Sequence, residues 1–237
     1  MTPLKNVVTL ITGTTVAQII PFLISPILTR LYKPEEFGNF TLYMSFVSVF
    51  GVIATLRYDL AVVQPQDDAD AKSIIILCLK INGVLTFLLL LGIALADLFY
   101  LYGITNIKIE WWTYFLPPTF MSLGIYNIFN YWLLRKKKYK EMSVSKVTQG
   151  ASIFLMQVLL SSIKSNGLII GQLFGYMLLA LITTFQSKKT LTNWQGVTKR
   201  RIKKNAKDYK EMPLFSTGGA LIDSLSQQLP NFVITKL

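Results

Sequence analysis

Histidine is absent from this sequence, and cysteine occurs once, at position 78. The lack of histidine excludes imidazole base catalysis and histidine-ligated metal sites. A lone cysteine excludes a disulfide or a thiolate metal cluster within one chain, and Cys78 stands in an apolar run where packing is its ordinary role. Charged residues are also scarce, at 15% of the chain, whereas soluble domains carry about 25%.

The chain is instead rich in long apolar runs, and hydrophobic residues make up 52% of it. A helix needs about 20 mostly apolar residues to cross a bilayer. Six stretches meet this length, and a seventh begins near Pro213 and runs to the last residue, Leu237. The sequence therefore predicts an all-α, polytopic transmembrane helix bundle with spans at residues 7–31, 37–63, 73–96, 111–134, 143–163 and 167–185. The first run lacks an A-x-A cleavage site, which indicates a retained span rather than a signal peptide.

The net charge of +12 is distributed unevenly between the two predicted sides of the membrane. If the N-terminus is cytoplasmic, sixteen Lys and Arg residues fall on the cytoplasmic side and four on the opposite side. Most of the sixteen belong to residues 135–140 and 188–210. This positive-inside bias predicts a cytoplasmic N-terminus. Because both basic runs lie directly beside spans, we expect contacts with membrane lipids and no nucleic acid partner.

Residues 5–31 and 211–237 align without gaps at an offset of 206, with four identities in 27 positions. Six spans separate the two segments, so both helices run in the same direction, as a parallel repeat of transporters requires. We therefore expect a six-helix lobe at residues 1–187, a basic cytoplasmic linker at 188–212, and the first helix of a second lobe at 213–237. On this reading the chain looks truncated, and we expect it to be inactive alone, with Asp223, Gln227 and Gln228 of the last helix left uncovered.

Ionisable residues inside spans usually face a cavity or a charged partner, because exposure to lipid is costly. Arg57, Lys80 and Lys146 fall at similar depths in the inner leaflet, and Asp59 lies close to that depth. Because residues two apart point to nearly opposite sides of a helix, Arg57 and Asp59 each need a partner on another element. Lys80 or Lys146 could meet Asp59, which leaves Arg57 for an anionic ligand; Lys146 could instead extend to the interface.

Three amides in the spans are further candidates. Asn127 and Asn130 share one face of the fourth span beside two tyrosines, where they could bind sugar hydroxyls or bond to neighbouring helices. Gln18 precedes Pro21 and Pro26 in the first span. Two prolines bend or open a helix and free backbone carbonyls, which is typical of static kinks and of moving or binding helices.

An enzymatic interpretation has one candidate, the Asp67-Asp68-Ala69-Asp70 cluster after the second span. Aspartate-rich loops hold Mg²⁺ and diphosphate in membrane prenyl transferases. Those enzymes use two such motifs, and this sequence has one. A solvated loop is therefore the favoured interpretation, and we expect no enzyme activity.

The sequence resembles the polysaccharide-biosynthesis flippases of the multidrug/oligosaccharidyl-lipid/polysaccharide superfamily, which export O-antigen and capsule repeat units. The matching segments include Arg57-Tyr58-Asp59, where relatives often carry Glu in place of Asp59, and extend over residues 18–21, 25–32, 34–38, 57–63, 209–213 and 226–230. Relatives have twelve to fourteen spans, more than are found here.

The resemblance implies that the chain moves an undecaprenyl-pyrophosphate-linked oligosaccharide across the bacterial inner membrane by alternating access, for O-antigen, lipopolysaccharide or capsule synthesis. It implies that Arg57, Lys80 and Lys146 bind pyrophosphate and sugar acids. Asn127, Asn130 and Gln18 would contact sugars. No cofactor is expected, and the polysaccharide polymerase and chain-length proteins are possible partners.

Two alternatives stay open at this point. One is a drug or cation antiporter of the same superfamily, although its cavity would need more acids than Asp59 and Asp223. The other is a non-transporting membrane fragment, or a half-transporter that dimerises.

Overall fold

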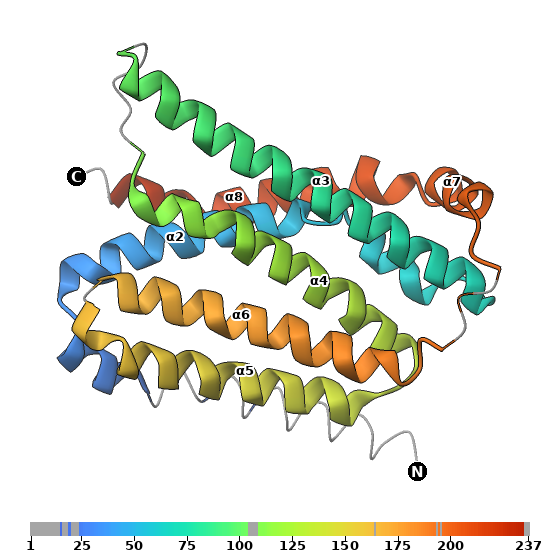
Figure 1. Cartoon of the computed structure of the whole chain (residues 1–237), viewed down its shortest axis with the longest axis horizontal. Coiled ribbons are helices and arrows are strands. Elements are labelled where there is room, and N and C mark those ends of the chain that lie inside the picture. The colour runs from blue at the N-terminus through green and yellow to red at the C-terminus, as the bar shows by residue number, and fades with distance from the viewer. Residues whose placement is uncertain are drawn as a thin grey trace.

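The computed structural model describes residues 15, 19, 24–103, 109–163, 165–192, 194 and 196–234, and those residues form helices and no strands (Figure 1). The all-α prediction is therefore confirmed. After a helical segment at residues 24–31, the long helices are α2 (Pro34–Ile53), α3 (Asp68–Leu101), α4 (Leu116–Arg135), α5 (Tyr139–Leu159), α6 (Ser165–Lys188) and α8 (Thr217–Ile234). Shorter helical segments connect them: η1 (Tyr58–Val63), η2 (Trp111–Phe115), η3 (Ser161–Ile163), α7 (Lys199–Asp208) and η4 (Met212–Ser216).

The long helices lie side by side as an up-and-down bundle, and α5 and α6 pack closely with α4 next to α6 (Figure 1). By length and composition, α2, α3 and residues 166–188 of α6 are suited to crossing a membrane. Helix α3 has 34 residues and a length of about 51 Å, so it exceeds a hydrocarbon core of about 30 Å. Helices α4 and α5, with 20 and 21 residues, run beside these three in the same bundle. The chain is thus a multi-pass membrane protein.

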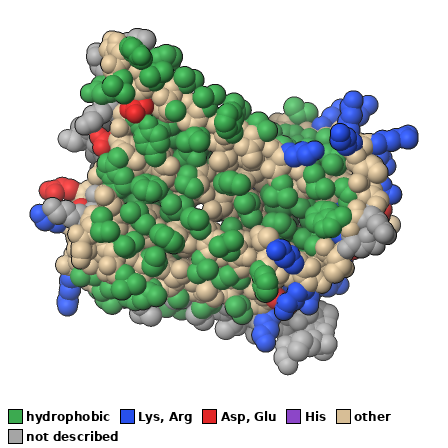
Figure 2. All heavy atoms as spheres, viewed as in Figure 1, with side chains coloured by type: hydrophobic (Ala, Val, Ile, Leu, Met, Phe, Trp, Pro, Cys, Tyr) green, Lys and Arg blue, Asp and Glu red, His purple; other side chains and the backbone are tan. Residues whose placement is uncertain are grey.

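The surface agrees with burial in a bilayer. Hydrophobic side chains cover the middle of the face shown in Figure 2, while Lys and Arg gather mainly at the end that carries α7. We call the end of the bundle that carries α7 the basic end. It also contains the α4–α5 turn and the first residues of α3. Both basic runs recognised in the sequence therefore meet at one end of the bundle.

Two buried clusters hold the helices together. Near the basic end, η1, α3 and α4 share a core built around Val62, Ile75 and Trp132. In the other half, α2, α6 and η2 meet around Tyr43, Ile169 and Trp112. Large side chains with almost no exposed surface fill both clusters, so α4 is held against its neighbours along much of its length.

Helix α8 packs along α2, contrary to the expectation that it would lack a covering partner. The Ser45 hydroxyl of α2 donates a hydrogen bond of 2.9 Å to Gln228 Oε1, and Asn231 Nδ2 donates to Ser45 Oγ at 3.2 Å. The rings of Phe46 and Phe232 meet edge to face at 5.2 Å between centroids. Gln228 and Asn231 therefore find partners in α2, and the prediction that Gln228 is uncovered was wrong. Asp223 and Gln227 are exposed, as expected, and bond to each other at 3.1 Å.

Candidate functional site

The second predicted span, residues 37–63, is not one continuous helix. Helix α2 ends at Ile53, and the backbone then takes two left-handed residues, Leu56 with φ 49° and Arg57 with φ 60°. Residues with a side chain rarely adopt this region, at a cost of about 1 kcal/mol or more each. The turn leads into the short helix η1, which begins at Tyr58. The expectation of an uninterrupted span is therefore corrected.

Polar contacts from α3 and within the break itself hold this segment in place. Asn82 of α3 is 1% exposed, and its Nδ2 donates to the carbonyl oxygens of Ala54 at 3.2 Å and Phe120 at 3.5 Å. Within the break, the Thr55 hydroxyl donates to Asp59 Oδ1 at 2.7 Å. Asn82 was not predicted from the sequence. The available signal was an amide inside a long apolar run, because such a group needs a polar partner at membrane depth.

Arg57 and Asp59 follow this break, close enough for the charge of one to act on the other. Asp59 is 3% exposed, and the positive charge of Arg57 acts on its carboxylate. The expectation that the two do not pair directly holds, although the chain there is not the continuous helix from which it was argued. They form no ion pair within 4.0 Å, and Arg57 Nε is buried with no hydrogen-bond partner in the part of the chain that the structure describes. A buried guanidinium nitrogen is thus left with an unused donor.

Tyrosines continue this polar region along α4 and into α6. The phenol of Tyr131 lies close enough to Arg57 and Asp59 to interact with both charges. Five residues earlier, the phenol of Tyr126 lies near the phenols of Tyr131 and of Tyr176 in α6. We call the set of Arg57, Asp59, Tyr126, Tyr131, Lys146 and Tyr176 the Arg57 cluster.

Lys146 of α5 belongs to this cluster because it points into the bundle. Its Nζ lies 4.5 Å from the centroid of the Tyr126 ring, in cation–π geometry. The alternative that Lys146 extends to the membrane interface is therefore not what the structure shows. The cluster combines two cations with one carboxylate.

Of the three predicted amides, Asn127 and Asn130 lie within the described residues and Gln18 does not. Asn127 and Asn130 are half-buried and share a face of α4 with Tyr131, as their spacing requires. Neither amide forms a side-chain hydrogen bond among the described residues, so the interhelical alternative is not observed. Gln18 lies outside the described residues.

Lys80 is not part of the Arg57 cluster. It is exposed on the surface of α3, whereas Lys146 points into the bundle against the Tyr126 ring. The expected convergence of Lys80 with Arg57 and Asp59 is therefore not found. Asp59 is approached by Arg57 and Thr55 instead.

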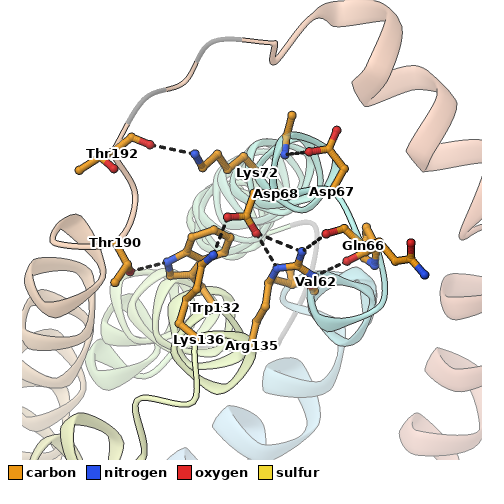
Figure 3. A network of polar contacts seen from close by, with 12 residues as sticks. Val62, Gln66, Asp67, Asp68, Lys72, Trp132, Arg135, Lys136, Thr190 and Thr192 are labelled. Atoms are coloured by element: carbon orange, nitrogen blue, oxygen red, sulfur yellow. Dashed lines mark hydrogen bonds and ion pairs between the residues drawn. The ribbon is translucent and has the colours of Figure 1, made fainter.

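At the basic end, the aspartates that suggested a metal site contact cations (Figure 3). Asp68 accepts from Arg135 at 3.1 Å and also pairs with Lys136. Arg135 donates further to the backbone carbonyls of Val62, Pro65 and Gln66, so it ties α4 to the loop before α3. Within the described residues, no group of three acids, cysteines or histidines could hold a metal ion. This arrangement braces the loop and replaces the expectation of a simply solvated segment.

Asp67 and Asp70 connect the same loop to α7. Arg201 Nη1 lies 2.7 Å from Asp67 Oδ2 and 3.5 Å from Asp70 Oδ1. The Ala69 backbone amide and the Arg201 guanidinium lower the pKa of Asp67, so its carboxylate stays ionised. Nearby, Lys72 donates to the Thr192 carbonyl at 2.9 Å and Trp132 Nε1 to Thr190 at 2.9 Å (Figure 3). The connection that follows α6 is thereby held against α3 and α4.

Comparison with known families decides what kind of protein carries this site. The model of a family described as polysaccharide biosynthesis protein matches residues 3–237. The chain belongs to this family. The resemblance stated from the sequence is thus confirmed, and membership in the polysaccharide biosynthesis family, together with the apolar helices, indicates a membrane protein with a role in polysaccharide biosynthesis. No curated protein and no solved structure matches the chain.

Proposed function

We propose that the chain takes part in flipping an undecaprenyl-pyrophosphate-linked oligosaccharide from the cytoplasmic to the periplasmic leaflet of the bacterial inner membrane. The product would serve O-antigen, lipopolysaccharide or capsule synthesis. Family membership supports the polysaccharide role, and the multi-pass bundle supports a substrate that resides in the membrane. The observation that carries the proposal is the buried, unpartnered donor of Arg57 beside the Asp59 carboxylate.

Arg57 is suited to the pyrophosphate group of such a substrate. A guanidinium presents donors in a planar fork that matches phosphate oxygens in a bidentate arrangement. Because Asp59 offsets part of the charge without forming a direct ion pair, the donors of Arg57 stay available to an anion. The strained backbone at Leu56 and Arg57 is typical of residues that are held in place for function.

The rest of the cluster fits a sugar chain with acidic groups. Lys146 supplies a second cation, and Tyr131, Asn127 and Asn130 supply groups that donate and accept hydrogen bonds to hydroxyls. Lys80 and Gln18 stay predicted substrate contacts. Transport would proceed by alternating access around this site and would be driven by an ion gradient or by the substrate gradient.

A drug or cation antiporter of the same superfamily is the competing function. Its binding site should be dominated by acids, because its substrates are cationic. The Arg57 cluster instead contains two cations, Arg57 beside Asp59 and Lys146 against the Tyr126 ring, and one carboxylate. This charge balance favours an anionic substrate.

Binding of undecaprenyl diphosphate to the chain in lipid nanodiscs tests the proposal. Replacing Arg57→Gln should weaken binding by about 10- to 100-fold, because a charge-assisted hydrogen bond is worth about 1.5–3 kcal/mol. Arg57→Lys should recover part of the affinity, since it restores the charge without the fork. Arg30→Gln is the matched control, as it removes the same charge from an exposed position.

Equal affinity of the Arg57→Gln variant and the unmodified chain would contradict the role of Arg57. Tighter binding of a lipophilic cation such as tetraphenylphosphonium than of undecaprenyl diphosphate would favour the antiporter instead.

A further inference from the structure

Helix α7 presents its two faces to very different surroundings. Its inner face is attached to the bundle, where Arg201 pairs with Asp67 and Asp70. Asn205 Nδ2 donates to the Asp70 side chain at 3.3 Å. Tyr58 Oη donates to the Ala206 carbonyl at 2.8 Å. Four polar contacts over two turns fix both the position and the rotation of the helix. The residues on its opposite face are therefore presented in a defined direction.

That opposite face is almost entirely cationic. Its exposed basic residues are Lys199, Arg200, Lys203, Lys204, Lys207 and, just after the helix, Lys210. Among the residues that the structure describes, none of the six forms an ion pair with an acid. Asp208 is the one acid of the helix itself. These five cations on a short helix and the sixth just after it repel each other, so the surface favours a negatively charged partner.

The ion pairs of Arg201 also set the depth of α7 relative to the membrane. They attach the helix to Asp67 and Asp70, at the first turn of α3, and the apolar part of α3 begins at Ile74. Four residues of helix correspond to about 6 Å. The headgroup layer on each side of the hydrocarbon core is about 5–8 Å thick, so α7 lies at its level.

Exposed apolar side chains flank α7 on both sides along the chain. Trp194 precedes it and is 45% exposed, while Leu214 and Phe215 follow it and are 65% and 74% exposed. Exposed tryptophan is typical of the membrane interface, where its ring meets headgroups and upper acyl chains. These residues give the basic helix a neighbouring contact with the bilayer itself.

A hollow at the N-terminal end of α7 could receive a headgroup. This cavity of about 470 Å³ is lined by Asp70, Thr198, Arg200, Arg201 and Lys204. Three of its five lining side chains are cationic, and Asp70 is already engaged by Arg201 and Asn205. A phosphate in the hollow would meet the free cations Arg200 and Lys204.

We propose that the exposed face of α7 binds anionic phospholipid headgroups in the leaflet at the basic end of the bundle. The occupant is the membrane in which the protein resides, because α7 is fixed at headgroup level beside a membrane-spanning helix. A nucleic acid would need a surface clear of the bilayer, so it is the less favoured partner. Lipid binding at α7 is separate from the Arg57 cluster and does not require it.

The test uses the whole chain in a neutral detergent, with phosphatidylglycerol or phosphatidylcholine of identical acyl chains added as probes and bound lipid counted by native mass spectrometry. We expect phosphatidylglycerol to bind more tightly than phosphatidylcholine and to be released by rising salt. The triple change Arg200→Gln, Lys203→Gln and Lys204→Gln should weaken phosphatidylglycerol binding by about 100-fold, since each basic residue near an anionic surface contributes about 1 kcal/mol.

The matched control removes three cations from the α4–α5 turn at the same end: Lys137→Gln, Lys138→Gln and Lys140→Gln. It should retain binding within about threefold if α7 is the site, whereas an equal loss in both variants would show a net-charge effect and overturn the proposal. Equal affinity for the two lipids would also overturn the proposal. So would tighter binding of a single-stranded oligonucleotide than of phosphatidylglycerol, or displacement of bound phosphatidylglycerol by an equal concentration of soluble glycerol phosphate. A charge-conserving variant that combines Arg200→Lys, Lys203→Arg and Lys204→Arg should bind as the native chain does.

Discussion

The side-chain amide of Asn82 donates a hydrogen bond to the backbone carbonyl of Ala54, 28 residues earlier in the chain. This bond connects the middle of α3 to the point where α2 ends. The two left-handed residues that place Arg57 follow directly, so the geometry of the candidate site depends on a residue outside it.

Replacing Asn82→Leu should lower the free energy of unfolding by about 1–3 kcal/mol, because it leaves the buried carbonyl of Ala54 without a donor. The measurement is thermal or denaturant unfolding of the purified chain in detergent. Asn127→Leu is the matched control, since that amide makes no side-chain hydrogen bond in the described region, and its change should be below about 0.5 kcal/mol. Equal losses in the two variants would show that the Asn82 bond is unimportant.

Gly124→Ala should destabilise the chain by about 1–3 kcal/mol through overpacking. A methyl group at Gly124 would overlap Asn82 Nδ2 and lie 2.5 Å from its Cγ, so the amide must move away from Ala54. Gly92→Ala in α3 is the control, because no atom lies within 4 Å of its added methyl group. A Gly124→Ala variant as stable as Gly92→Ala would refute the close approach of α3 and α4.

Arg57→Gly separates backbone strain from ligand binding. Glycine adopts a φ of 60° without steric cost, so this variant should keep its stability or gain up to about 1 kcal/mol. It should nevertheless lose affinity for undecaprenyl diphosphate as Arg57→Gln does. Unfolding and lipid-binding measurements on the same sample check both halves, and a marked loss of stability would show that the guanidinium has mainly a structural role.

Arg135→Gln should cost about 2 kcal/mol of stability, because Arg135 bonds to Asp68 and to three carbonyls of the loop before α3 (Figure 3). Arg135→Lys should recover only part of the loss, since an ammonium cannot reproduce the planar fork. Lys137→Gln, at an exposed position in the same turn, should have little effect. Full recovery by lysine would indicate that charge alone is needed.

Lys137→Cys should be labelled by a membrane-impermeant thiol reagent from the cytoplasmic side and protected in intact cells. Cys78 is buried and should contribute little background. Labelling of Lys137→Cys from outside intact cells would reverse the proposed topology, whereas labelling in inverted vesicles is the expected result.

The sequence by itself determined the helical class, the approximate positions of several spans and the charge difference between the two ends, while most of the first predicted span lies outside the described residues. Run length, apolar content and nearby Lys and Arg are local properties, and a bilayer acts on them locally. Residues 167–185 were predicted as a span and lie within α6, and residues 73–96 lie within α3. The motifs that indicated the family are likewise read along the chain.

Only the tertiary structure decided how the candidate site is assembled. The break after Ile53 is stabilised by Asn82, and the direction of Lys146 is set by the ring of Tyr126 on another helix. The pairing of Ser45 with Gln228 joins residues 183 positions apart. Each of these contacts links segments distant in sequence, and a hydropathy pattern carries no information about which side chains will meet. The buried polar groups of a membrane bundle must find partners among neighbouring helices, so those neighbours, and not the local sequence, place Arg57.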